Sequence, residues 1–364
     1  MSKISIMWPK LPPAERIAPY LKAIDSSRIY SNFGPLVLSF EERLAAHFGV
    51  REEMIGTVAN ATQGLTLALA ALDVRPGTLC VLPAWTFVAS VHAAVSAGLT
   101  PYFVDVDPKM WALDPDKMDD MIACAPAPVG AIMPVAPFGR PIDVAAWDHY
   151  RARTGIPVVI DAAAGFDSAV PGHTPLVVSL HATKIIGVGE GGFVLTTDEA
   201  VIRGVRARAN FGFLGARASI AASTNAKLSE YHAAVGHASL DEWADARAEW
   251  ITVAAAYKKL LPESSRIQYQ AGFGAEWIAS TCVLSFPGSD TRKIACALSD
   301  AGIETRRWWG EGAHLHPSSA EFPRNALPVT ETLVKSTLSI PFYRDLGLAH
   351  VKLVTDTIRA AMAT

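Results

Sequence analysis

Apolar runs of strand length alternate with helical patterns in the first half of the chain, and this alternation restricts the fold more than any other feature. The apolar runs lie at 54–62, 79–83, 101–107, 130–139 and 156–167. The segments between them carry apolar residues at helical spacing. A chain that repeats strand, helix and strand builds a largely parallel sheet with helices on its faces. The sequence therefore predicts an α/β fold with a mostly parallel central sheet flanked by helices.

The two ends of the chain differ from this pattern. A proline-rich arm opens the chain at 1–13, and a long helical stretch at 225–261 suits a connection between two domains. After Pro262, shorter strands and helices alternate as in a small α+β unit. We therefore expect a large domain with an N-terminal arm at 1–240 and a small C-terminal domain at 241–364.

Composition indicates a globular protein that works without nucleic acid or a membrane. Half of the residues are hydrophobic, 18% are charged and the formal net charge is −3, so no basic surface for nucleic acid is indicated. The four cysteines are scattered, which predicts neither a disulfide framework nor a zinc site. The N-terminus lacks the apolar core of a signal peptide, and no apolar run reaches the roughly 18 residues of a membrane span. A cytoplasmic protein is expected.

A single lysine interrupts two apolar runs in the stretch 177–196, VVSLHATKIIGVGEGGFVLT. Burial of a charged lysine is costly, so the amine either stays at the surface of a turn or becomes neutral and reacts with a carbonyl cofactor. Ser179 and His181 lie two residues apart, so they share a face in strand geometry. We favour the hypothesis that Lys184 carries pyridoxal phosphate (PLP).

An acid ends the strand predicted at 156–167. Asp161 follows the run IPVVI, and α/β sheets place ligands at the carboxyl ends of their parallel strands. By itself Asp161 is also compatible with an ordinary capping residue. Beside a lysine that carries PLP, its carboxylate would keep the pyridine nitrogen protonated and make the ring an electron sink.

A helix start at 60–64, NATQG, offers a site for the phosphate of the same cofactor. Free N–H groups at a helix N-terminus bind phosphate, and the hydroxyl groups of Thr62 and Ser179 would assist them. The same residues also suit a plain N-cap. In the following PAWTF segment, Trp85 or Phe87 could stack on a flat ring, whereas the other packs in the core.

Two further patterns do not predict a cofactor. The glycines of 187–192 satisfy G-x-G-x-x-G, but they lead into a strand and not a helix, which argues against a dinucleotide site. His314 and His316 share one face of a segment that reads as extended. Binding of a metal, contact with a substrate and a structural role all remain open for this pair. No third metal ligand stands at a spacing typical of metal sites.

The chain resembles the DegT/DnrJ/EryC1/StrS family of sugar aminotransferases, within the fold-type I (aspartate aminotransferase-like) PLP enzymes. The likeness covers nearly the whole chain, and SLHATK followed by EGG is its most specific part. Weaker motifs arrive in the order of the family: NFGPLVLSFEERLAAHFG, NATQGLTLALAAL, LPAWTFVASVHAAVSAGLTPYFVDVD, PFGRPIDV, VIDAAAG, NAKLSEYHAAVG and LSIPFY. The local sequence around DPDKM, LHATK and NFGF is similar to that of enzymes that aminate nucleotide-linked 4-keto-6-deoxy sugars.

The resemblance implies PLP as cofactor and a set of residues that bind it. By this resemblance the cofactor contacts fall on Thr62, Gln63, Phe87, Asp161, Ser179, Lys184 and Asn225. Lys184 matches the lysine bound to the cofactor, and Asp161 matches the partner of the pyridine nitrogen. Asn225 matches a residue that reaches the cofactor phosphate of the neighbouring subunit, so a homodimer with shared active sites is implied.

The implied reaction moves an amino group from glutamate to a nucleotide-linked keto sugar, with Lys184 as the proton shuttle. The chain departs from the family at Ala164, where relatives usually have a glutamine or histidine that contacts the phenolic oxygen of the cofactor. Two alternatives follow: a PLP-dependent sugar dehydratase, and a regulatory protein whose site has decayed. A branch of the family that dehydrates sugars has a histidine in place of the lysine, so Lys184 argues against the first alternative.

Substrate contacts are predicted on the segment 304–317, ETRRWWGEGAHLHP, and near Asn225. Arginines pair with diphosphate groups and tryptophans stack on bases. The candidates for substrate binding are Lys227, Arg306, Trp308 and His314. An alternative for the tryptophans is that they anchor the small domain.

Overall fold

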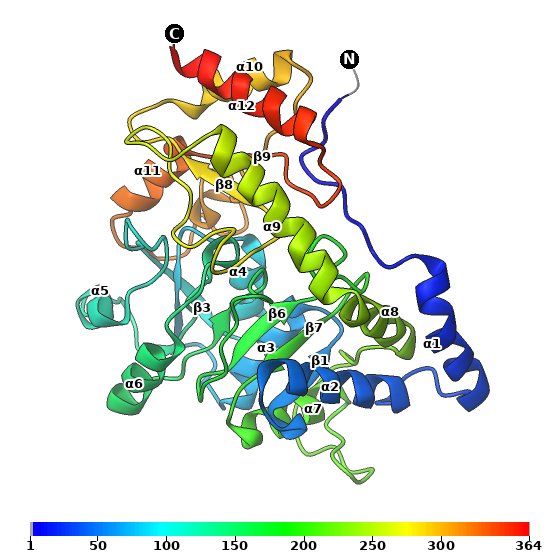
Figure 1. Ribbon diagram of the computed structural model, residues 1–364. Coiled ribbons are helices and arrows are strands. Elements are labelled where there is room, and N and C mark those ends of the chain that lie inside the picture. The colour runs from blue at the N-terminus through cyan, green and yellow to red at the C-terminus, as the bar shows by residue number, and fades with distance from the viewer. Residues whose placement is uncertain (1–2, 364) are drawn as a thin grey trace.

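A computed structural model describes residues 3–363, and its centre is a sheet of seven strands (Figure 1). The strands are β1 (Ile55–Val58), β2 (Leu79–Pro83), β3 (Thr100–Val104), β4 (Val129–Ile132), β5 (Ile160–Asp161), β6 (Leu176–Ser179) and β7 (Gly192–Leu195). Two ladders, β1-β7-β6-β5 and β3-β2-β4, are joined by parallel bridges from Ile132 to Val158 and from Val135 to Asp161. The resulting order is β3-β2-β4-β5-β6-β7-β1. Only β7 runs antiparallel to its neighbours, which confirms the predicted α/β fold with a mostly parallel sheet.

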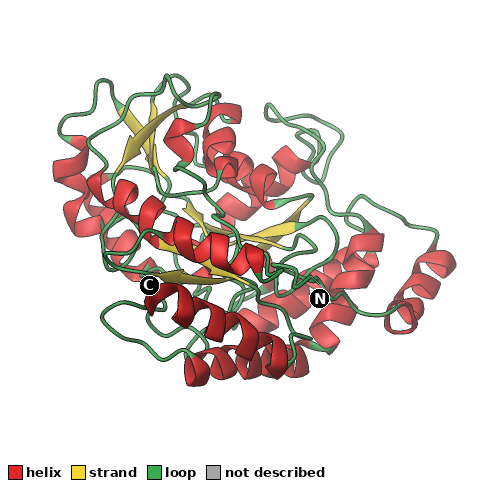
Figure 2. Ribbon diagram, turned by 90° about the horizontal axis from the view of Figure 1, so that it is seen from above, coloured by secondary structure: helices red, strands yellow, loops and turns green. Residues whose placement is uncertain are grey.

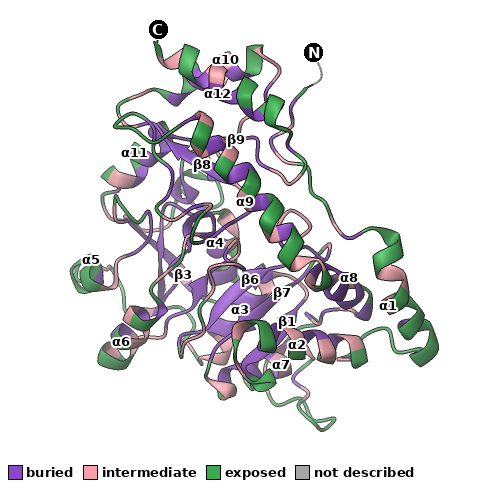
Figure 3. Ribbon diagram, viewed as in Figure 1, coloured by how far each residue is buried: buried purple, intermediate pink, exposed green. Residues whose placement is uncertain are grey.

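Helices cover both faces of the sheet (Figure 2). The helices of this part of the chain are α1 (Ala14–Ser27), α2 (Pro35–Phe48), α3 (Ala61–Ala71), α4 (Val88–Ser96), α5 (Met118–Ile122), α6 (Val144–Thr154), α7 (Glu199–Ala209) and α8 (Glu230–Asp241). Neighbouring residues of β6 point to opposite faces, as strand geometry requires. Val177 belongs to the same buried cluster as Leu65 of α3, whereas Val178 belongs to the cluster that contains Phe40 of α2. The strands are therefore buried on both faces and the polar sides of the helices face solvent (Figure 3).

The C-terminal part of the chain has its own small sheet. The elements here are α9 (Trp243–Leu260), β8 (Cys282–Ser285), α10 (Thr291–Asp300), α11 (Pro328–Ser336), β9 (Thr337–Ile340) and α12 (Leu348–Ala363). β8 and β9 pair antiparallel, and α12 packs against α9 and α10. The division of the chain into domains near residue 240 remains a prediction.

Backbone hydrogen bonds join the N-terminal arm to this C-terminal part. The N–H of Ile4 donates to the carbonyl of Gly302, and the N–H of Phe342 donates to the carbonyl of Ile6. From there the arm runs down to α1, which packs against α8 (Figure 1). The arm thus links the C-terminal part of the chain to α8.

Two local predictions were wrong. The helix expected over 225–261 begins only at Glu230, because Asn225 pairs with Asn210 in an extended bridge and Ser229 caps α8 with its side chain. It is also interrupted at Glu242, which lies between α8 and α9. The segment around His314, expected to be extended, forms a short 3-10 turn over Ala313–Leu315. In residues 3–363, no helix has the length and apolarity needed to cross a membrane.

Candidate active site

The predicted site residues meet at the edge of the sheet where β5 and β6 end. Val58, Ser179 and Gly192 form one row across β1, β6 and β7. Asp161 ends β5 one strand away, opposite Val177 of β6. The helix α3 starts three residues after β1 ends, so its N-terminus lies against this row. The order of the strands thus brings residues together that are far apart in the sequence.

A cavity of about 440 Å³ opens beside this edge. The predicted site residues that line it are Thr62, Phe87, Asp161, Ser179, Lys184, Arg306 and Trp308. Phe87 precedes α4 and is 55% exposed, so its ring is free to cover a flat ligand. Ala164 also lines the cavity, and it contributes no polar side chain there.

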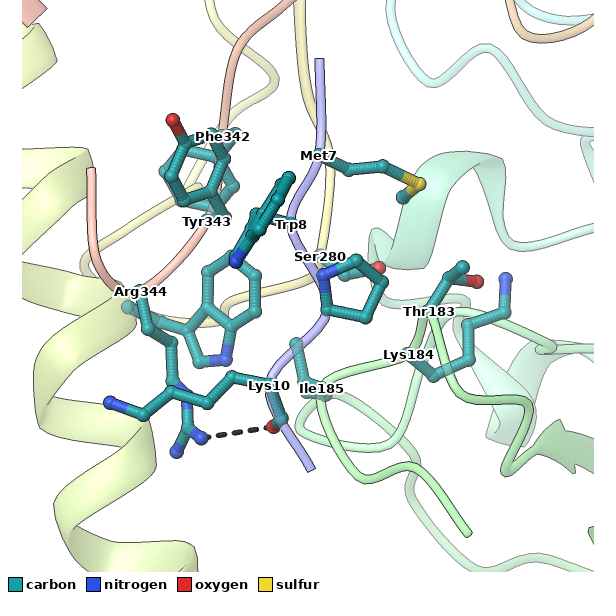
Figure 4. A pocket seen from close by; sticks show the side chains of 12 residues that line it. Met7, Trp8, Lys10, Thr183, Lys184, Ile185, Ser280, Phe342, Tyr343 and Arg344 are labelled. Atoms are coloured by element: carbon teal, nitrogen blue, oxygen red, sulfur yellow. Dashed lines mark hydrogen bonds between the residues drawn. The ribbon is translucent and has the colours of Figure 1, made fainter. Parts of the chain in front are cut away.

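Lys184 lies in a tight turn that follows β6. Its N–H donates to the carbonyl of His181 at 2.9 Å, and the N–H of Ala182 donates to the carbonyl of Gly189 at 2.8 Å. Gly189 has a φ of 99°, a left-handed conformation that favours glycine. The turn presents the half-buried Lys184 side chain to the cavity, away from Lys10 and Arg344 (Figure 4). The glycines that follow the lysine therefore shape this turn.

Burial changes the acid–base properties of Lys184 and Asp161 in opposite senses. Burial lowers the pKa of Lys184, and the nearby Asp161 carboxylate partly opposes this. Burial raises the pKa of Asp161, and hydrogen bonds from Ser90 and Ala163 together with the charge of Lys184 oppose the rise. The lysine is thereby biased toward the neutral amine that attacks carbonyl groups.

Both oxygens of Asp161 accept hydrogen bonds from the protein. Ser90 Oγ donates to Oδ2 at 2.6 Å, and the N–H of Ala163 donates to Oδ1 at 3.0 Å. Sequence reasoning missed Ser90. No local pattern in the sequence links Ser90 to Asp161, which is 71 positions away.

The N-terminus of α3 keeps unpaired N–H groups for a ligand. Asn60 Oδ1 accepts from the N–H of Gln63 at 2.9 Å, as an N-cap does. Among the described residues the N–H groups of Ala61 and Thr62 have no partner. Together with the hydroxyl groups of Thr62 and Ser179, which line the cavity, they form a site suited to an anion.

Aromatic residues and one cation form the side of the cavity that comes from the C-terminal part. The guanidinium of Arg306 lies 4.6 Å from the centre of the Trp308 ring. Trp309 stacks on Phe138 at 3.9 Å between ring centres, and both line the cavity. Trp85 instead is buried against Trp309, so of the PAWTF aromatics it is the one that packs in the core.

Met7, Ser280 and Thr281 also line this cavity, and sequence reasoning missed them. Met7 comes from the N-terminal arm, and the other two immediately precede β8. No local pattern in the sequence links these segments to the site.

Four predicted residues do not line the cavity: Gln63, Asn225, Lys227 and His314. Lys227 Nζ donates to Asn225 Oδ1 at 2.7 Å and lies 4.5 Å from the centre of the Phe211 ring. His314 is buried beside Phe103, with ring centres 6.2 Å apart. No group of three His, Cys, Asp or Glu side chains that could hold a metal occurs within residues 3–363.

Comparison with known proteins identifies the family. A transaminase from Shigella dysenteriae, dTDP-4-amino-4,6-dideoxy-D-glucose transaminase, is 34% identical over 244 residues, which is 65% of each chain. The crystal structure of DesI, determined in the presence of its TDP-sugar product, has a TM-score of 0.88 and 30% identity, and the match covers 99% of this chain and 93% of DesI.

A putative PLP-dependent aminotransferase from Bacillus cereus ATCC 10987 gives a TM-score of 0.89 at 28% identity, over 98% of this chain and all of that one. A sequence model of the family matches residues 13–359, nearly the full length. The chain belongs to the DegT/DnrJ/EryC1/StrS aminotransferase family.

Proposed function

We propose that this aminotransferase uses PLP to move an amino group from glutamate to a nucleotide-linked keto sugar, with Lys184 as the residue that holds the cofactor. One observation carries the proposal: Lys184, Asp161 and the N-terminus of α3 surround a single cavity. An amine, an acid and an anion site in one cavity match the aldehyde, the ring nitrogen and the phosphate of PLP.

Each end of PLP has a matching group in this cavity. Asp161, the last residue of its apolar strand, would accept a hydrogen bond from the protonated ring nitrogen. The unpaired N–H groups of Ala61 and Thr62 and the hydroxyl of Ser179 would hold the phosphate. Phe87 would cover one face of the ring. The side chains present therefore fit the cofactor.

Bound PLP supplies an electron sink for the bond that is broken at the α-carbon of the amino donor. When the amine of the donor displaces Lys184 from the cofactor, the freed lysine amine would act as the base that removes the proton of this carbon, and burial helps because it favours the neutral amine. In the second half of the reaction the same amine returns a proton to the acceptor carbon. Asp161 stays ionised and stabilises the positive ring nitrogen throughout.

The class of the acceptor is inferred from the cavity wall and from the relatives. The guanidinium of Arg306 provides a cation for the diphosphate of the acceptor. The nearby Trp308 ring provides a flat surface on which its nucleobase can stack. The Shigella relative is named for a dTDP-linked 4-amino-4,6-dideoxy sugar and the DesI structure for a TDP-sugar product. We therefore propose a nucleotide-linked 4-keto-6-deoxy sugar as acceptor.

We also propose a homodimer and a division into two domains. Asn225 is exposed and, like its hydrogen-bonded neighbour Lys227, lies outside the cavity of its own chain, which supports a contact with a second copy. The proposed boundary between 1–240 and 241–364 is supported by the nearby break between α8 and α9 at Glu242. The oligomeric state is measured by light scattering of the purified protein.

The proposed function is tested on purified protein loaded with PLP. Glutamate should bleach the visible absorbance of the bound cofactor, and mass spectrometry should find an aminated product from one member of a panel of nucleotide keto sugars. Loss of water from a sugar without transfer of the amine would indicate a dehydratase instead. A protein that neither binds PLP nor responds to glutamate would contradict the proposal and favour a regulatory role.

A further inference from the structure

Two buried hydroxyl groups lead to the carboxylate of Asp161. Ser90 lies in the first turn of α4, is 0% exposed and has its Oγ 2.6 Å from Asp161 Oδ2. Thr86, equally buried, has its Oγ1 2.8 Å from Ser90 Oγ. The three side chains are thus joined by consecutive hydrogen bonds that end on the carboxylate of Asp161 at the cavity.

The direction of these two hydrogen bonds follows from the number of hydrogens that each group can donate. A hydroxyl group has one hydrogen to donate, and an ionised carboxylate only accepts. Ser90 therefore donates to Asp161 and accepts from Thr86. The other acceptor open to Thr86, the carbonyl of Phe87, is farther away at 3.4 Å. Hydrogen bonds that run in one direction polarise and strengthen one another.

The hydrogen bond from Ser90 acts on the charge of Asp161. Burial raises the pKa of this carboxyl, and the hydrogen bond from Ser90 is the largest effect that lowers it. A hydrogen bond to the ionised form makes a carboxylate less basic. Without it, Asp161 would compete more strongly for a proton shared with a neighbouring base.

We propose that Ser90, supported by Thr86, is a positioning residue that keeps Asp161 ionised and thereby keeps the shared proton on the ring nitrogen of bound PLP. This rests on the proposed function, in which Asp161 faces that nitrogen. Ser90 acts through Asp161 and does not itself react. The proton moves only between the nitrogen and the carboxylate, so no further reactant is required.

The proposal is tested by nitrogen NMR of PLP labelled with nitrogen-15 at the ring, loaded into the native protein and its variants at one fixed pH. The native protein should give the signal of a protonated ring nitrogen. Ser90→Ala should move this signal toward that of the neutral nitrogen, and Asp161→Asn provides the reference for complete loss of the proton. Thr86→Val, which keeps the buried volume, should move the signal in the same direction by a smaller amount.

Ser96→Ala is the matched control, because Ser96 ends the same helix and is exposed. It should leave the signal unchanged. In Ser90→Ala, kcat should fall by about tenfold or more while KM for glutamate changes little, as expected for the loss of a hydrogen bond to a charged group.

The outcomes separate this proposal from the proposed function. A native protein with a protonated nitrogen and a Ser90→Ala signal at the same position would overturn the role of Ser90 and leave the aminotransferase assignment intact. If Ser90→Ala fails to load, Thr86→Val decides by the same criterion. A neutral nitrogen in the native protein would overturn the role of Asp161, and the role of Ser90 with it.

Discussion

Ser179 lies opposite Gly192 in the antiparallel ladder of β6 and β7, and the first turn of α3 rests on this pair. A Cβ on Gly192 would lie 2.8 Å from the backbone nitrogen of Ala61 and 3.0 Å from the carbonyl oxygen of Val178. The absence of a side chain at Gly192 therefore lets the helix start reach the edge of the sheet. The anion site of α3 and the hydroxyl of Ser179 meet because of this close approach.

Gly192→Ala should weaken the binding of PLP. The added methyl group would push the N-terminus of α3 away from Ser179, since backbone atoms on both sides leave no room for it. We expect the dissociation constant of PLP to rise by about tenfold or more, measured by absorbance titration of the cofactor-free protein. Gly56→Ala in β1 is the control, because a Cβ there meets Ile202 at an ordinary 3.4 Å. Equal affinities in the native protein and Gly192→Ala would contradict the proposed phosphate site.

Lys184→Ala should abolish the reaction and the visible absorbance of lysine-bound PLP. The variant loses both the covalent attachment and the base, so we expect turnover to fall on the order of a thousandfold or more. Lys10→Ala is a suitable control. Lys10 also lies near the lysine turn, but its Nζ pairs with Asp345 at 2.8 Å and its side chain extends away from that of Lys184 (Figure 4). Full activity in Lys184→Ala would refute the assignment of the cofactor lysine.

The parts of this site that the sequence predicts are those with a local signature. Lys184 and Asp161 stand at the ends of apolar runs, and Thr62 stands at a helix start, so their positions follow from the order of strands and helices alone. The hydroxyl of Ser179 is predicted on the same grounds, and the family resemblance favours Phe87 over Trp85 as the stacking aromatic. The parallel order of the central sheet followed from the same alternation.

The residues that sequence reasoning missed depend on contacts between distant segments. Ser90 reaches Asp161 across 71 positions of the chain, and Met7 enters the cavity only because the arm is bonded to Gly302 and Phe342. Neither the hydrophobic periodicity nor a local sequence motif predicts such contacts. The error at His314 is of the same kind, because its ring lies beside that of Phe103, a contact between distant segments, and the residues around it form a 3-10 turn.

Arg306→Ala and Arg307→Ala should affect the acceptor differently although they are neighbours. Arg306 lines the cavity, whereas Arg307 donates to Thr291 Oγ1 at 2.7 Å and is not part of the wall. Loss of a charged hydrogen-bond donor should raise KM for the nucleotide sugar by about tenfold or more in Arg306→Ala. The half-reaction with glutamate should stay close to native, because the diphosphate takes no part in it. A larger increase of KM in Arg307→Ala than in Arg306→Ala would show that the diphosphate is bound elsewhere.

The rate at which PLP attaches to the cofactor-free protein should depend on pH through Lys184. Only the neutral amine attacks the aldehyde, so the rate rises as the pH rises through the pKa of Lys184, which burial lowers below the value of about 10.4 for free lysine. The charge of Asp161 opposes this lowering. Asp161→Asn should therefore move the midpoint of the rate profile to a lower pH, followed by stopped-flow absorbance. Glu190→Gln is the control, since Glu190 lines the same cavity but is exposed, and it should leave the midpoint in place. A midpoint that stays constant or rises in Asp161→Asn would show that the carboxylate does not act on the lysine.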